Sequence, residues 1–251
     1  MSKTIFILLV FLSFSCNADK DSDIKAPFHN YFKSVSEIPL PMGYKRITLD
    51  SGSFGAWLRS VNLKKDNHVY LFNGKLKENQ SAQFAVLDIS VGKKDLQQCA
   101  DAVMRLRAEY LFKTKRYDEI VFTDNNGKKY HWEGRADRIG FEKYLENVFG
   151  WCNSASLEKQ LNSVSDLHQM EVGDVFIRGG FPGHAMIVID MAENSKGEKI
   201  YMLAQSYMPA QDIHIVKDPM DAKISPWYKI EDSKEIITPE YEFYSNQLRK
   251  W

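Results

Sequence analysis

One cysteine and one histidine are the residues of this chain best suited to chemistry. Cys99 falls in the first turn of a predicted helix over residues 95–114. There the positive end of the helix dipole and the free backbone N–H groups favour a thiolate. His184 opens an apolar strand over residues 185–189. A histidine at the mouth of a strand, opposite a helix N-terminus, can take the proton of a thiol. The pattern predicts Cys99 as nucleophile and His184 as base.

A third residue should orient the imidazole. Asp190 shares the strand face of His184, but six residues of strand place it about 20 Å away. Pairing of the next hairpin brings a better partner. If the loop is centred near residues 194–195, Gln205 lies opposite His184, and a loop centred one residue later makes it a diagonal neighbour on the same face. Its amide oxygen can accept from a ring N–H, which predicts Gln205 as the residue that orients the base.

Each of these residues also has a purely structural interpretation. Cys99 lies on the buried stripe of its helix, and free cysteine is often a small core residue. His184 and Gln205 are polar groups of the kind found at the end or edge of a sheet. Cys152, just before a short predicted helix, competes as the nucleophile or as a disulfide partner of Cys99. Such a disulfide would end the catalytic interpretation for the oxidised chain.

Two weaker groups of residues lie near the predicted site. Asp212 and His214 share a strand face and with His184 would give a metal site, but no third ligand has a fixed spacing, so a solvated strand edge is favoured. Aromatic side chains predict either the walls of a substrate groove or the packing of the C-terminal arm: Tyr207, Trp227 and Tyr228.

Composition and missing motifs exclude several classes. The chain has 33 basic and 33 acidic residues, so no overall positive field exists to hold nucleic acid or an anionic membrane. Three cysteines are too few for a disulfide framework. Phosphate-binding glycine loops, dinucleotide fingerprints, HExxH, CxxC and G-x-S-x-G motifs are all missing. We therefore expect no cofactor and no resident metal.

The elements that must position the site follow from periodicity. Turn residues mark a hairpin loop over 193–197. Strands are predicted at 69–72, 84–91, 174–178, 184–191, 200–205 and 213–216, a hairpin at 120–132, and helices at 95–114, 141–149 and 157–164. Residues 25–66 and the arm after Pro219 are expected to be irregular. This order predicts a single α+β domain over residues 25–251, with the long helix packed on an antiparallel sheet.

The first residues predict an export signal. An apolar run of twelve residues follows Lys3 and is too short to span a bilayer. Residues 1–15 fit a signal peptide, Cys16 the lipidated residue of a bacterial lipoprotein, and residues 16–24 a polar tether. Ordinary cleavage nearby is the alternative. We expect a protein of the bacterial cell envelope, in the periplasm or at the outer membrane, attached to membrane only through its lipid anchor.

Two stretches carry a resemblance to the NlpC-type papain-like cysteine peptidases and amidases: Gly173-Asp174-Val175-Phe176 and residues 183–189. In that family a Gly-Asp strand precedes a histidine that opens an apolar strand, and the third residue lies on the following strand. The resemblance implies a papain-like core, and the order of the predicted elements adds a small helical and hairpin insertion to it. Here the usual Asp-Cys-Ser-Gly context of the thiol is replaced by residues 98–101, Gln-Cys-Ala-Asp.

A second resemblance covers nearly the whole chain after the tether. The sequence is similar to an uncharacterised bacterial family, domain of unknown function 4846, which implies a secreted or lipid-anchored protein. The similarity lies in the strings at 95–102, 105–111, 182–185, 204–211 and 225–228.

Together these patterns predict a papain-like thiol hydrolase or amidase of the envelope, acting on an amide bond of a peptidoglycan-like or other peptide substrate. The alternative is a non-catalytic lipoprotein that binds peptide or glycan in the same cleft. The state of the Cys99 thiol separates the two, because an enzyme needs it free and acidic.

Overall fold

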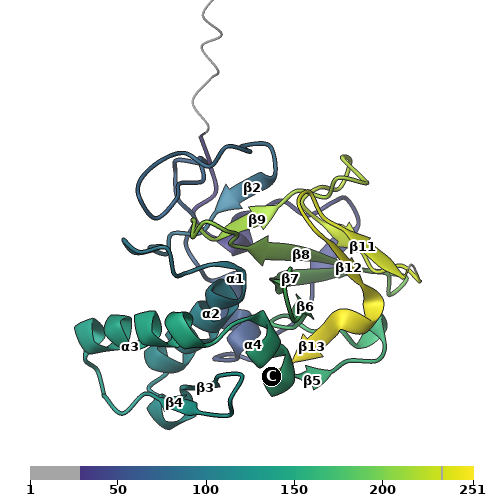
Figure 1. Cartoon of the computed structure of the whole chain (residues 1–251). Coiled ribbons are helices and arrows are strands. Elements are labelled where there is room, and N and C mark those ends of the chain that lie inside the picture. Colours follow the sequence, from purple (N-terminus) through teal and green to yellow (C-terminus); the bar gives the residue numbers. More distant parts are fainter. Residues whose placement is uncertain (1–28, 233) are drawn as a thin grey trace, which may run out of the picture.

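The computed structural model describes residues 29–232 and 234–251. The predicted signal peptide, Cys16 and the tether over residues 16–24 lie outside these ranges. Within them the chain forms a mixed α+β fold around a nine-stranded sheet (Figure 1). None of the helices in these two ranges has the length and hydrophobicity that a membrane-spanning segment requires.

A long antiparallel hairpin, β7 (His184–Asn194) and β8 (Lys199–Gln205), forms the centre of the sheet. Its strands are almost entirely buried because they are apolar over nearly their whole length. The strand order is β2-β9-β8-β7-β6-β13-β5, with β1 on β7 and β10 on β8. The remaining strands are β1 (Tyr44–Arg46), β2 (Gln83–Val86), β5 (Asn162–Ser163), β6 (Val175–Arg178), β9 (His214–Val216), β10 (Tyr228–Lys229) and β13 (Leu248–Lys250).

Helices cover one face of the sheet, and a separate hairpin covers part of the other (Figure 1). The helices are α1 (Phe54–Arg59), α2 (Cys99–Lys113), α3 (Arg138–Trp151) and α4 (Ser154–Gln160). The covering hairpin is β11 (Glu235–Ile237) with β12 (Glu242–Tyr244), and β3 (Val121–Thr123) pairs with β4 (Lys129–His131) beside the helices. Short 3-10 turns lie at Val35–Glu37, Tyr117–Glu119, Leu167–Gln169 and Ser245–Gln247.

Alternation along β7 divides its side chains between two hydrophobic cores. Ala185 and Ile187 face the helices and join the larger core. Met186 and Val188 face the other way and join a smaller core with Phe243 of β12. His184 has the parity of Met186, so the alternation places its side chain on the hairpin side of the sheet.

The predicted strands and hairpins of the second half are confirmed within a few residues. Other expectations need correction. Residues 69–72 form only isolated bridges, since this stretch lies outside the sheet. The C-terminal arm is not irregular: it contributes β10 to β13, and β13 joins the sheet against β6. Residues 25–66 include β1 and α1.

Candidate functional site

Cys99 is the first residue of α2, and its side chain is half-buried. The helix begins four residues later than predicted, because Gln98 rather than Asp95 is its N-cap. The backbone N–H of Gln98 donates to Asp101 Oδ2 at 3.0 Å. Asp95 instead accepts from the backbone N–H of Ala210 at 2.7 Å. The later start leaves Cys99 in the first turn, as predicted.

The surroundings of Cys99 shift the pKa of its thiol in two opposite directions. Interactions with the backbone of Ala100, Ala185 and Cys99 itself lower the pKa of the thiol and so favour the thiolate. Burial, followed by the nearby Asp101 carboxyl, opposes them and raises the pKa of the thiol to about 11. The thiol is therefore neutral at pH 7. Its contact with Ala185 places the sulfur beside the residue that follows His184.

His184 and Gln205 form the predicted contact. His184 Nε2 lies 2.7 Å from Gln205 Oε1, and both side chains are buried. Ile187 pairs with Ala204, so Gln205 is the diagonal neighbour of His184 on the same face. The hairpin loop is thus centred later than residues 194–195, because Glu193 pairs with Lys199.

The partners of the Gln205 amide decide which ring nitrogen of His184 carries the proton. Gln205 Nε2 donates to Glu240 Oε2 at 2.9 Å, and it lies 3.3 Å from His214 Nε2. Because a carboxylate can only accept, the amide nitrogen must face Glu240 and the amide oxygen must face His184. His184 then donates from Nε2, which leaves Nδ1 as the unprotonated nitrogen.

Aromatic rings enclose the imidazole of His184. Tyr207, Tyr241 and Phe243 lie with their ring centroids 4.7, 4.8 and 5.8 Å from it. Burial lowers the pKa of His184 to about 4, although Gln205 favours the charged form. The imidazole is therefore uncharged at pH 7, as is the thiol of Cys99, and it is available as a base.

Cys99 and His184 lie near the same end of β7 but on opposite sides of the sheet, and among the described residues no hydrogen bond joins the thiol to the imidazole. The imidazole packs among rings on the hairpin side, whereas the thiol approaches from α2 and faces the Ala185 peptide. Tyr207 lies near both groups, because its ring packs on His184 and its hydroxyl senses Cys99. Burial, then Glu240 and then Cys99, raises the pKa of its hydroxyl.

The metal site considered as a weaker possibility for Asp212, His214 and His184 is not formed. Asp212 accepts from Lys64 Nζ at 2.8 Å and from the backbone N–H of Tyr70 at 3.1 Å, so its carboxylate is already occupied. His214 Nδ1 lies 2.9 Å from the carbonyl oxygen of Asp212. Residues 29–232 and 234–251 contain no group of three or more metal-ligating side chains.

The competing thiol, Cys152, is buried at the end of α3. Both Cys99 and Cys152 are free, so the considered disulfide is not present between them. Burial, with Asp124 and Asp101 adding to it, raises the pKa of Cys152 to about 12. This thiol is less accessible and less acidic than that of Cys99, which disfavours it as nucleophile.

Two of the three predicted groove residues lie away from the site. Trp227 is 1% exposed, and its Nε1 donates to the carbonyl oxygen of Pro39 at 2.8 Å. Tyr228 is buried and pairs with Tyr201, which lies at the other end of β8 from Gln205. Both rings fill core space, since large aromatic side chains gain most from burial. Only Tyr207 lies beside the imidazole.

Sequence reasoning missed Glu240 and Lys77, which complete the polar surroundings of Gln205. Glu240 lies in the turn between β11 and β12, within the arm expected to be irregular. Lys77 lies in the loop that precedes β2. Neither has a local pattern that separates it from a surface charge.

Comparison with known proteins identifies only the family. Searches of curated proteins and of solved structures give no match. A family model described as domain of unknown function 4846 matches residues 35–139 and 133–250. These segments cover most of the chain, including every residue of the site described above. The chain therefore belongs to the family of domain of unknown function 4846.

Proposed function

We propose that this protein is a papain-like cysteine hydrolase that cleaves an amide bond, with Cys99 as nucleophile, His184 as base and Gln205 as the orienting residue. The observation that carries the proposal is the arrangement at one end of β7. The half-buried thiol lies beside the backbone of Ala185, and the adjacent residue His184 donates from Nε2 to Gln205 Oε1 at 2.7 Å. NlpC-type peptidases and amidases supply the analogy for the core.

The first chemical step forms a thioester. The Cys99 sulfur attacks the amide carbonyl carbon while its proton passes through one water molecule at the end of β7 to Nδ1 of His184, and the carbonyl π electrons move onto oxygen. The backbone N–H of Cys99, at the start of α2, contributes to holding that oxyanion. Collapse of the tetrahedral intermediate breaks the C–N bond, and the amine leaves with the proton from His184.

Hydrolysis of the thioester completes the cycle. Water attacks the acyl carbon, gives one proton to Nδ1 of His184, and expels the sulfur, which takes that proton back. The acid product is released, and both groups return to their neutral forms. Because the resting pair is neutral, the base acts as the thiol attacks rather than by forming a stable ion pair beforehand.

A peptide substrate of the cell wall fits the proposed location. The apolar run before Cys16 supports an exported, lipid-anchored protein, and envelope amide bonds are found in peptides that link cell-wall glycans. This choice of substrate rests on location and fold analogy.

The test is the rate of Cys99 alkylation against pH, on the chain carrying Cys16→Ser so that two thiols remain. We expect labelling that depends on Cys99 and slows several-fold with His184→Ala. Cys152→Ala should leave the rate unchanged, since that thiol is buried. Labelling of Cys99 that is identical with and without His184 would overturn the enzyme proposal.

A second function, peptide or glycan binding without catalysis, is favoured by one observation. Burial raises the pKa of Cys99 to about 11 and lowers that of His184 to about 4, which are the directions opposite to those of an activated pair. In a binding protein, His184→Ala would leave the alkylation rate at the value of an ordinary buried thiol. Equilibrium binding of cell-wall peptides to the Cys99→Ala variant would then be measured directly.

A further inference from the structure

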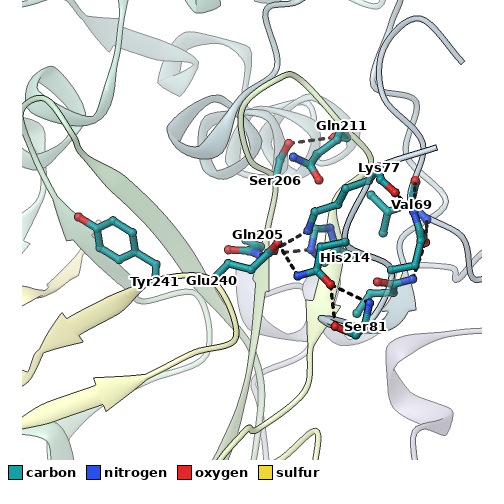
Figure 2. Close-up of polar contacts among 12 residues, drawn as sticks. Val69, Lys77, Ser81, Gln205, Ser206, Gln211, His214, Glu240 and Tyr241 are labelled. Carbon is teal, nitrogen blue, oxygen red and sulfur yellow. Dashed lines mark hydrogen bonds and ion pairs between the residues drawn. The ribbon is translucent and has the colours of Figure 1, made fainter. Parts of the chain in front are cut away.

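Glu240 joins the buried side chains of Lys77 and Gln205 (Figure 2). Its Oε2 atom accepts both from Lys77 Nζ and from Gln205 Nε2, the latter at 2.9 Å. Its Oε1 atom accepts from Asn79 Nδ2 at 3.0 Å. The side chains of Lys77 and Glu240 are 9% and 14% exposed, so the ion pair is largely shielded from water. One carboxylate oxygen is thus shared by a cation and the amide that contacts His184.

The loop before β2 is built to hold Lys77 in place. The backbone N–H of Lys77 donates to the carbonyl oxygen of Val69 at 2.9 Å, and the carbonyl oxygen of Lys77 accepts from Gln80 Nε2 at 2.8 Å. Gln80 Nε2 also donates to Val69, and its Oε1 accepts from the Val69 N–H. A lysine ammonium is expensive to bury, so a loop fixed this firmly around one points to a defined role for the charge.

We propose that Glu240, held by Lys77, is a positioning residue of the Cys99–His184–Gln205 site, which fixes the Gln205 amide so that its oxygen always faces His184. An amide can rotate by half a turn and exchange its donor and acceptor ends at little cost. The carboxylate removes that freedom, because it accepts and never donates. A turned amide would require His184 to carry its proton on Nδ1, and Nδ1 could then accept no proton from a thiol.

The charges of Glu240 and Lys77 also shift the pKa of the His184 imidazole, in opposite directions. Beyond burial and the Gln205 contact, Glu240 raises the pKa of His184 and Lys77 lowers it. The other titratable groups around the ring are His214, Tyr207, Tyr241 and, beside Ala185, Cys99.

The proposal rests on the proposed function for its catalytic meaning, but its test does not. The experiment uses nitrogen-15 NMR of the His184 ring on the Cys16→Ser chain, which reports the protonated nitrogen and its titration whether or not Cys99 is reactive. Three variants are compared with the parent: Glu240→Gln, Lys77→Met and the pair Lys77→Met with Glu240→Leu. Glu242→Leu, an exposed position on β12, is the matched control.

In Glu240→Gln the Lys77 ammonium, which only donates, keeps the new amide oxygen at the shared position. We therefore expect Nε2 to remain the protonated nitrogen while the pKa of His184 falls. Lys77→Met should raise that pKa. The double variant removes both charges without stranding one, and the ring should then populate both tautomers. Cys99 alkylation should slow about fivefold in the double variant, the effect of losing one hydrogen bond, and recover in Glu240→Gln.

A ring that keeps a single Nε2–H tautomer in the double variant would overturn the proposal. So would shifts of the same sign, or none, in Glu240→Gln and Lys77→Met. The two single variants keep the test decisive if the double variant does not fold. Altered tautomers with unaltered alkylation would support the positioning role and count against the hydrolase, so the two failures are distinct.

Discussion

His184 Nε2 lies 2.7 Å from Gln205 Oε1, across two strands that are otherwise almost wholly apolar. Both side chains are buried, at 2% and 1% exposure. A buried polar pair must satisfy its hydrogen bonds internally, because an unpaired group would lose its hydration without compensation. The pair therefore extends through Gln205 to His214 and Glu240.

Exchanging the amide and the carboxylate should charge the imidazole. The double variant Gln205→Glu with Glu240→Gln keeps one donor and one acceptor in the contact between positions 205 and 240 but brings the anion into direct contact with His184. An adjacent carboxylate favours the imidazolium, so the pKa of His184 should rise from about 4 by one to three units. An NMR pH titration of the ring measures it. A pKa that stays near 4 would mean that burial alone controls this residue.

Gly183 should tolerate no side chain. A Cβ atom there would lie 2.5 Å from the carbonyl oxygen of Gly180 and 2.8 Å from that of Arg178. Gly183→Ala must shift this loop, so we expect a loss of about 1–3 kcal/mol in the free energy of unfolding and a disturbed His184 ring signal. Gly150→Ala is the matched control, since nothing lies near its Cβ position. Urea unfolding measures both, and equal midpoints would contradict the close approach.

Asp190 should be essential for stability rather than for the site. Its carboxylate is fully buried and accepts from Arg46 Nε and Arg59 Nε, each at 2.7 Å. Removing one partner of a buried ion pair costs about 3–5 kcal/mol, and we expect Asp190→Ala to lose stability in that range by urea unfolding.

The exposed pair of Lys94 and Glu146 gives the comparison for Asp190. Glu146→Gln should change the free energy of unfolding by less than about 1 kcal/mol. If the two substitutions lower the free energy of unfolding equally, burial does not strengthen the ion pairs of Asp190.

Acid should weaken the fold through its buried histidines. Burial lowers the pKa of His214 to about 3 and that of His184 to about 4, from 6.5. Between pH 6.5 and these values the unfolded chain binds more protons than the folded chain, so stability falls as the pH falls. The loss for His214 between pH 7 and pH 5 should approach about 2 kcal/mol.

Urea midpoints at the two pH values test this with His214→Gln, which should lose less stability on acidification than the parent. Asp174 works in the other direction, because burial raises its pKa to about 7 and its contribution declines as the pH rises from 3.8. The comparison is therefore made between variant and parent. A pH dependence unchanged by the substitution would mean that His214 is not titrating in the unfolding reaction.

The local sequence pattern was enough to predict the central hairpin and the positions of Cys99, His184 and Gln205 within their elements. Alternation and the turn residues of 193–197 predict β7 and β8, and pairing arithmetic brings Gln205 to the face of His184. The helical stripe predicts α2 with Cys99 in its first turn. These features depend on residues close in sequence, where the period of the backbone leaves few alternatives.

Contacts between distant segments depended on the tertiary structure. The sequence determined that a thiol, an imidazole and an amide lie at the ends of their elements. Only the packing decided that Glu240 and Lys77 contact each other beside the Gln205 amide, that Trp227 fills the core, and that His184 faces the β11–β12 hairpin. Loops and short strands carry little periodic signal, and their places are set by which buried surfaces and charges they satisfy once the sheet has formed.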